Sequence, residues 1–452
     1  MNNRKEMLGK EPLLKLLIKL SIPAMTGMFV MASYNVVDTI FIGWGVGPYG
    51  IAAAAAAFPV QFFVNALAML VAIGTASLSS RKLGSGDDDG AERALGNGFL
   101  MSSAIGIAAL AGGLLFLEPL VTLTGTHDEV RALTITYLKI VFLGNPVVIV
   151  AMLFNNTIRS EGNTRYAMFS MVLPAVLNAF LDPLFIFAFK MGIAGAAWAT
   201  VTGQVVMLGW NVRYYVSGHR SLIALKPSKM PLRRETAFEI LSIGFSEFMR
   251  MAAMCISSGI LMYQLSDYGS PYHIAAYGIM MKVSSIAVMP VFGIGQGMQP
   301  VVGYCYGAGL YQRARKAVEI AMICASAITV VGEIILQAFP HIFVMGFTDD
   351  PEVMRLTVWG VRILQSTFAI IGFQIIGTVT FQALGFAGPA LFLSLSRQVI
   401  FFIPSLLILP RFFGITGVFM CYPVADIFAC IITLVMLMIY KKKFKELERG
   451  AA

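Results

Sequence analysis

Twelve long apolar segments run along this chain, each separated from the next by a polar or Gly/Pro-rich cluster. A helix needs about 20 mostly apolar residues to cross the hydrocarbon core of a bilayer. The chain has 452 residues, of which 58% are hydrophobic and 13% charged, so little sequence is left outside these segments. The sequence therefore predicts an all-α membrane protein with twelve transmembrane helices and no soluble catalytic domain.

The basic residues predict the orientation of the chain. Most of the 33 Lys and Arg residues fall at the termini or in loops that follow even-numbered segments. The positive-inside rule then places both termini in the cytoplasm of a cell with the protein in its inner (plasma) membrane. The net charge of +9 is explained by these loops and by the basic tail 441–445, so no nucleic-acid partner is expected.

No cofactor is expected from the remaining composition. The five cysteines and four histidines are scattered, without the spacing of a zinc, haem or disulfide site. The basic N-terminus precedes an apolar run that is too long for a signal peptide, and it predicts the first membrane span instead.

The chain contains an internal repeat. Gly74 matches Gly297 and Gly162 matches Gly385 at 223 positions, and Gly192 follows with Gly414 at 222. Each copy holds six spans, an even number, so the two copies enter the membrane in the same direction and are related by a pseudo-two-fold axis along its normal. Two similar bundles are typical of transporters that work by alternating access.

The repeat predicts how the chain is divided. The predicted parts are an N-terminal lobe, a cytoplasmic linker, a C-terminal lobe and a basic cytoplasmic tail, at 1–216, 217–235, 236–440 and 441–452.

Charged residues inside the spans predict the functional site. Asp38 and Asp182 are the clear mid-span acids of the first half, and Asn178 lies one helical turn before Asp182. Thr200 and Tyr137 add hydroxyl groups from two further spans. Such an all-oxygen set suits a hard cation such as Na⁺, and two close carboxyl groups equally suit a proton. The alternative is a hydrogen-bonded knot with a structural role only.

Neither acid recurs in the second half, where positions 260 and 404 hold Ile and Pro. The fold therefore does not require these acids, and coupling is assigned to the first half. Glu247 and Arg250 lie three residues apart and are interpreted as a local ion pair. No role is assigned to Lys282 or Asp426.

Other residues of the first half predict a hinge and a substrate cavity. Pro23 makes the first span bendable, because proline removes a hydrogen bond of the helix. Flexible methionines suit varied apolar ligands. The residues expected to line the cavity are Met28, Met31, Tyr34, Asn155 and Met171.

Several motifs together resemble one known family. The strings SIPAM, VVDTIFIG and RKLGSGDDDGAERA, then VLNAFLDPLFIF with GIAGAAWAT, and RQVIFFIP with GITGVFM are similar to those of the multidrug and toxic compound extrusion (MATE) family. The resemblance covers essentially the whole chain. It implies twelve helices in two lobes, and export of amphiphilic, often cationic compounds in antiport with Na⁺ or H⁺.

The resemblance also implies which residues act. By motif, Asp38, Asn178, Asp182 and Thr200 form the cation or proton site of the first lobe, with Tyr137 nearby. Span ten carries no acid, so the chain resembles the branch that couples through the first lobe. The expected partners are small amphiphilic molecules, the coupling ion and the bilayer, and the protein is expected to act as a monomer.

Two other functions fit part of the sequence. A flippase for lipid-linked oligosaccharides belongs to the same superfamily, although twelve spans and an acidic first lobe argue against it. The string at 84–87 matches the GxGD motif of intramembrane aspartyl proteases, but it lies in a polar loop, where a turn explains it.

Overall fold

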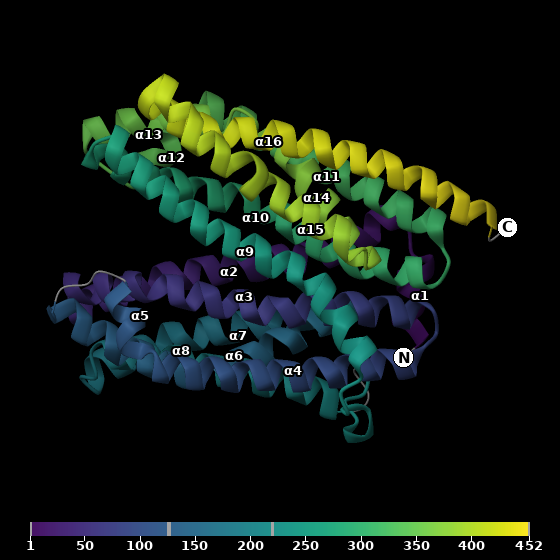
Figure 1. Ribbon diagram of the computed structural model, residues 1–452. Helices are drawn as coiled ribbons and strands as arrows, with labels where there is room; N and C mark the ends of the chain where they lie inside the picture. Colours follow the sequence, from purple (N-terminus) through teal and green to yellow (C-terminus); the bar gives the residue numbers. More distant parts are fainter. Residues whose placement is uncertain (1, 124–127, 218–220, 451–452) are drawn as a thin grey trace. The chain divides into compact units, whose positions relative to one another are not determined.

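The computed structural model describes residues 2–123, 128–217 and 221–450, and its regular elements in that part of the chain are helices (Figure 1). The helices are α1 (Asn2–Lys10), α2 (Leu13–Val46), α3 (Pro48–Gly84), α4 (Asp88–Leu115), α5 (Leu117–Leu123), α6 (Asp128–Ser160), α7 (Thr164–Pro183), η1 (Leu184–Ala188), α8 (Ile193–Val216), η2 (Pro227–Lys229), α9 (Arg234–Tyr268), α10 (Pro271–Gly307), α11 (Tyr311–Ala338), α12 (Pro340–Val344), α13 (Pro351–Leu364), α14 (Phe368–Leu384), α15 (Ala387–Leu395), η3 (Ser396–Phe402) and α16 (Ile403–Gly450).

The described helices account for the predicted spans. Ten stretches are long and apolar enough to cross a bilayer, and α13 with α14 forms one more, bent by 54° at a short break. One of the ten, Ala387–Lys442, contains Gly414, whose backbone is not helical, and so holds two spans. These stretches make twelve spans, as predicted. In lipid a helix satisfies its own backbone hydrogen bonds, which is why apolar segments of this length adopt it.

The chain packs as two compact units. Unit 1 comprises residues 1–10 and 26–248, and unit 2 comprises 11–25 and 249–452. The boundaries fall inside α2 and inside α9, so the first span of each repeat begins in one unit and ends in the other. The domain limits predicted from the sequence divide the chain by repeat rather than by packing, and they stay a prediction.

Two glycines of the repeat allow the first span of each copy to begin in one unit and end in the other. In unit 1, the Cα of Gly74 on α3 faces the carbonyl oxygen of Ile240 on α9, where an added Cβ would lie only 1.9 Å from that oxygen. In unit 2, Gly297 on α10 faces Ser21 on α2, with 2.7 Å between an added Cβ and the Ser21 nitrogen. The repeat thus preserves a close helix contact that needs a residue without a side chain.

The backbone of the turns repeats as well. Glycines with positive φ occur in three matched pairs, whose φ values are 76° and 71°, 79° and 80°, and 56° and 56°. The pairs are Gly86 with Gly309, Gly162 with Gly385, and Gly192 with Gly414. L-residues rarely adopt this conformation, so each turn needs glycine in both copies.

The turn at 84–87 shows why its sequence mimics a protease motif. Gly86 supplies the left-handed residue, and Asp87 caps α4 by accepting a hydrogen bond from the backbone N–H of Gly90 at 2.8 Å. Lys82 donates to Asp87 at 2.9 Å and lowers the pKa of this carboxyl group. Asp87 is thus used as a helix cap and ion-pair partner.

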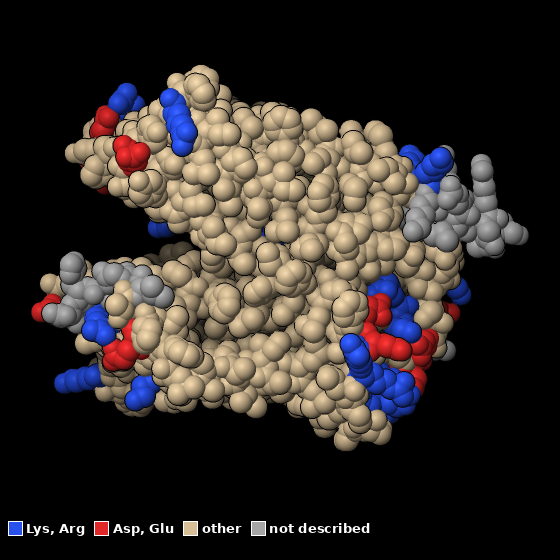
Figure 2. Space-filling view, in the orientation of Figure 1, with Lys and Arg blue, Asp and Glu red and all other residues tan. Residues whose placement is uncertain are grey.

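On the face that Figure 2 shows, charged side chains in each unit gather near the ends of the helices, and the surface between those ends is almost free of them. Among the described ion pairs, Lys5 with Asp88 and Lys226 with Glu92 lie at one end of unit 1. Arg131 and Glu118 pair near the other end of its helices. This distribution is that of a protein whose middle section lies in hydrocarbon.

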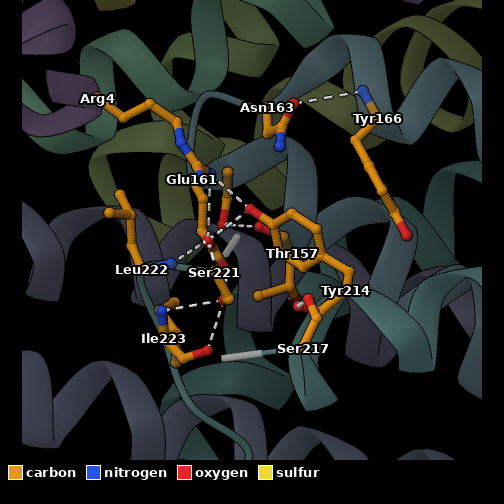
Figure 3. A network of polar contacts seen from close by, with 11 residues as sticks. Arg4, Thr157, Glu161, Asn163, Tyr166, Tyr214, Ser217, Ser221, Leu222 and Ile223 are labelled. Carbon is orange, nitrogen blue, oxygen red and sulfur yellow. Dashed lines mark hydrogen bonds and ion pairs between the residues drawn. The ribbon is translucent and has the colours of Figure 1, made fainter. Parts of the chain in front are cut away.

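A buried carboxylate outside the spans holds several parts of unit 1 together. Glu161 lies in the turn after α6 and is fully buried (Figure 3). It accepts hydrogen bonds from Tyr214 Oη at the end of α8 (2.8 Å), from Ser221 Oγ (2.9 Å) and from the backbone N–H of Leu222 (2.7 Å). Arg4 on α1 donates to the same tyrosine at 2.5 Å.

This network joins α1, the turn between α6 and α7, the end of α8 and the segment that leads to α9. Sequence analysis did not identify Glu161, because an acid in a short polar turn usually indicates solvent exposure. The network fixes the ends of α6 and α8, the helices that carry Tyr137 and Thr200.

We predict a pH-dependent stability from Glu161. Burial raises its pKa to about 7, although Leu222, Tyr214, Ser221 and Arg4 oppose that rise. A folded-state pKa above the unfolded value stabilises the fold at pH values below the unfolded pKa, near 4.5, and the contribution is lost as pH rises through about 7. Glu161→Gln, which stays neutral, should remove this dependence in thermal unfolding measured in detergent across that range.

The matched control is Glu118→Gln, a side chain that is 65% exposed. It should leave the slope of stability against pH unchanged. An equal slope in wild type and Glu161→Gln would contradict the prediction.

Candidate functional site

Asp182 lies at the end of α7 and is completely buried. Asn178, one turn earlier on the same helix, is also buried, and its side-chain amide lies against Asp182. The orientation that satisfies both ends of this amide turns Nδ2 to Asp182, at 2.5 Å from Oδ2 and 3.3 Å from Oδ1. Pro183 follows, and the helix widens there into the π-helical segment η1. Helix α7 thus presents a carboxyl group with one amide donor in the interior of unit 1.

Asp38 on α2 faces Asp182, close enough for the two carboxyl groups to interact directly. Asp38 Oδ1 is buried, and no donor among the described residues reaches it. Two ionised carboxylates that face each other directly repel, and neither can donate a hydrogen bond to the other. A single proton between them would supply the missing donor and remove the repulsion.

A third helix completes this arrangement. The backbone N–H of Thr200 on α8 donates to the side-chain oxygen of Asn178 at 3.2 Å. The Thr200 hydroxyl lies 3.2 Å from the hydroxyl of Tyr34 on α2. Helices α2, α7 and α8 are therefore linked by polar side chains around the two acids.

Tyr137 enters the site from α6. It is buried and lies within electrostatic range of Asp38 and Asp182. Its hydroxyl interacts with Gln61 on α3, a residue that the sequence analysis did not single out. Gln61 has one available signal, because it is a polar residue in the middle of an apolar span.

The structure therefore brings together the five residues predicted to form the coupling site. They come from α2, α6, α7 and α8 of unit 1. Their role in coupling stays a prediction, as does the predicted binding of Na⁺.

The residues predicted to line a substrate cavity lie in different settings. Met28, Met31 and Tyr34 are partly buried along α2. The sulfur of Met171 packs against Gly27, at 3.3 Å from an added Cβ. Asn155 is buried, and it cross-links α6 to α7 by donating to the carbonyl of Ala167 (2.9 Å) and to Ser170 Oγ (2.5 Å). Their contact with substrate stays a prediction.

The predicted hinge residue lies close to a boundary between the units. Pro23 is buried within α2, which runs unbroken from Leu13 to Val46. The boundary between unit 2 and unit 1 falls between Met25 and Thr26. Its role as a hinge stays a prediction.

Two copies of a six-helix unit, with a buried carboxyl pair in the first, define a duplicated helical membrane transporter. The model of the MatE family matches residues 23–184 and again 248–407, one match within each copy of the repeat. The chain belongs to this family, the MATE transporters of the MOP superfamily. Its members are transporters and not enzymes, so the protease alternative does not apply.

Individual relatives agree with the family. The multidrug export protein MepA of Staphylococcus aureus is 25% identical over 92% of both chains, and the FAD transporter of Shewanella oneidensis is 25% identical over the same shares. The solved structure of the MATE multidrug transporter DinF-BH in complex with rhodamine 6G is 38% identical, with a TM-score of 0.89 over 95% of this chain and 96% of that one.

We predict that Asn178 stabilises the fold by satisfying Asp182. Asn178→Ala leaves the buried carboxyl without its donor, which should cost about 1 to 3 kcal/mol. In the double variant with Asp182→Asn, the unsatisfied group is neutral. The stability losses of the two single variants should therefore sum to more than the stability loss of the double variant. Thermal unfolding in detergent of the four proteins measures this cycle. Additive losses would mean that the two residues do not interact.

Proposed function

We propose that this protein exports amphiphilic cationic compounds in antiport with protons, by alternating access. The observation that supports this most directly is the pair of facing carboxyl groups of Asp38 and Asp182, which lack a donor for one buried oxygen. Placing two acids in a membrane interior costs free energy, and such pairs are usually retained because they bind and release a charged group. A proton and a cationic compound are both such charges.

The proposed cycle uses the pair as an exchange site. With one proton, the two acids share it and the pair carries a single negative charge. When the proton leaves, both carboxylates are charged, and a cationic compound relieves their repulsion. Because a ligand moves a conformational equilibrium only by its difference in affinity between two states, proton and compound must favour different states of the site. Pro23 in α2 is the residue we propose as the bend between them.

We place the proton before Na⁺ because the orientation that satisfies both ends of the Asn178 amide turns its nitrogen to Asp182. A sodium ion needs oxygen ligands. Here Asn178 donates to Asp182, and its oxygen accepts from the Thr200 backbone, so this amide offers the pair a hydrogen-bond donor. Sodium is the second candidate for the coupling ion, since Asp38, Asp182 and the Thr200 hydroxyl could still supply oxygens.

The names of the relatives support transport of small molecules but do not agree on the cargo. MepA is named as a multidrug exporter and the Shewanella protein as an FAD transporter, at the same identity to this chain. DinF-BH was solved with rhodamine 6G. We base the preference for cations on the two carboxyl groups of unit 1. We further propose that the protein lies in the plasma membrane, that both of its termini are cytoplasmic and that it acts as a monomer.

We predict that Asp38→Asn and Asp182→Asn each abolish proton-driven efflux of rhodamine 6G from proteoliposomes. Each substitution removes a group that changes charge and leaves the volume nearly unchanged, so the protein should still fold. Proton and sodium gradients are imposed separately, and wild type should respond to the proton gradient.

Asp267→Asn, at the end of α9, is the control and should retain activity. Efflux at the wild-type rate by either site variant would remove that acid from the mechanism. Efflux driven by sodium alone would reject the proton.

A further inference from the structure

Unit 2 contains its own polar cluster, at positions that the repeat relates to the site of unit 1. The offset of 223 carries Gln61 to Ser284, and the offset of 222 carries Thr200 to Tyr422. Ser284 accepts a hydrogen bond from Gln365 Nε2 at 2.5 Å, and the Tyr422 hydroxyl lies 2.9 Å from that of Tyr277. The repeat thus keeps a polar interior in unit 2 although the two acids of unit 1 have no counterpart there.

Unit 2 also contains an ion pair with a buried carboxylate. Asp426 on α16 is 2% exposed and accepts a hydrogen bond from Arg397 Nε at 2.5 Å. Its other oxygen accepts from the hydroxyl of Thr367 at 3.3 Å. Thr367 lies in the break between α13 and α14, where the span bends. Both oxygens of Asp426 are therefore engaged, and the carboxylate holds the guanidinium in one orientation.

Arg397 keeps most of its donors unused. A guanidinium has five N–H groups, and in the described part of the chain only Nε finds an acceptor. The side chain is 32% exposed, in contrast to its partner. Arg397 lies ten residues after Ala387, the first residue of α15, which is about 15 Å along a helix axis. It lies inside Ala387–Lys442, a stretch long and apolar enough to cross a bilayer.

An arginine with unused donors inside a membrane span needs an acceptor. Hydrocarbon offers none, and a charged side chain at mid-membrane usually faces a cavity or a substrate path. The two terminal amino groups of a guanidinium are spaced to bind both oxygens of a carboxylate. Tyr422 lies within electrostatic range of Arg397.

We propose that Arg397, oriented by Asp426, binds a carboxylate group of the transported compound in unit 2. The proposal rests on the transport function proposed above and extends it to compounds that carry a carboxylate. Other oxyanions, such as a phosphate group, share the same chemistry, and the experiment separates them.

The test uses two dyes that differ only in the group of interest. Rhodamine 6G carries an ethyl ester, and its free acid carries a carboxylate on the same cationic ring system. Binding of each dye to the detergent-purified protein is measured by fluorescence anisotropy. The double variant Arg397→Gln with Asp426→Asn removes the pair without leaving a buried charge. It should bind the acid about tenfold more weakly than wild type and bind the ester equally well.

Three further proteins sharpen the result. Arg397→Lys keeps the charge but loses the two-pronged geometry, so its affinity for the acid should lie between those of wild type and the double variant. Lys282→Gln removes another positive charge of unit 2 and should leave both dyes unaffected. Asp182→Asn should weaken binding of the cationic ester, which separately tests the cation site proposed in unit 1.

The outcomes are distinct. No loss of acid binding in the double variant, or an equal loss of acid and ester, overturns the proposal. If Lys282→Gln loses as much affinity for the acid as the double variant does, the loss reflects only the removal of positive charge from unit 2. That result also overturns the proposal. Competition of inorganic phosphate with the acid, measured in wild type, would assign the site to phosphate groups instead of carboxylates. Failure of rhodamine 6G efflux in wild type would reject the proposed function and leave the binding result intact.

Discussion

The cost of placing a carboxyl group in the membrane interior constrains unit 1. Asp182 is fully buried, and the Asp38 oxygen that lacks a donor is buried too. Such groups persist only where other side chains or a mobile charge compensate them. The helices around them are placed accordingly: α7 supplies the Asn178 donor, α8 supplies Thr200, and the Glu161 network fixes the ends of α6 and α8. The helix bundle is thus organised around a charge that it cannot fully satisfy on its own.

Duplication supplied the scaffold, and the two copies then diverged in charge. The turns keep their glycines with nearly the same φ, and both copies keep a polar interior. Unit 1 holds two acids with few donors, whereas unit 2 holds a paired guanidinium with few acceptors. One interior therefore suits a cationic group and the other an anionic group. The shared fold does not imply a shared role for the two interiors.

Much of this arrangement could be predicted from the sequence, because membrane spans obey strong local rules. Apolar length predicted twelve spans, and the glycine offsets predicted the repeat. Asp38 and Asp182 stood out as acids in apolar surroundings, and they do lie together. Contacts between distant residues could not be predicted in this way: Glu161 looked like an ordinary loop acid, and the partner of Asp426 is 29 residues away on another helix. The exchange of helix starts at α2 and α9 likewise depends on tertiary packing, which leaves no periodic signal.

The central claim is that a proton and a cationic compound compete for the carboxyl pair of unit 1. The most direct measurement is the number of protons released when rhodamine 6G binds to purified protein in weakly buffered detergent solution. Linkage requires that a compound whose affinity rises with pH release protons on binding. The account predicts up to one proton released per bound molecule by wild type, and none by the Asp38→Asn, Asp182→Asn double variant. Release that is equal in both proteins, or absent from wild type at every pH, would contradict it.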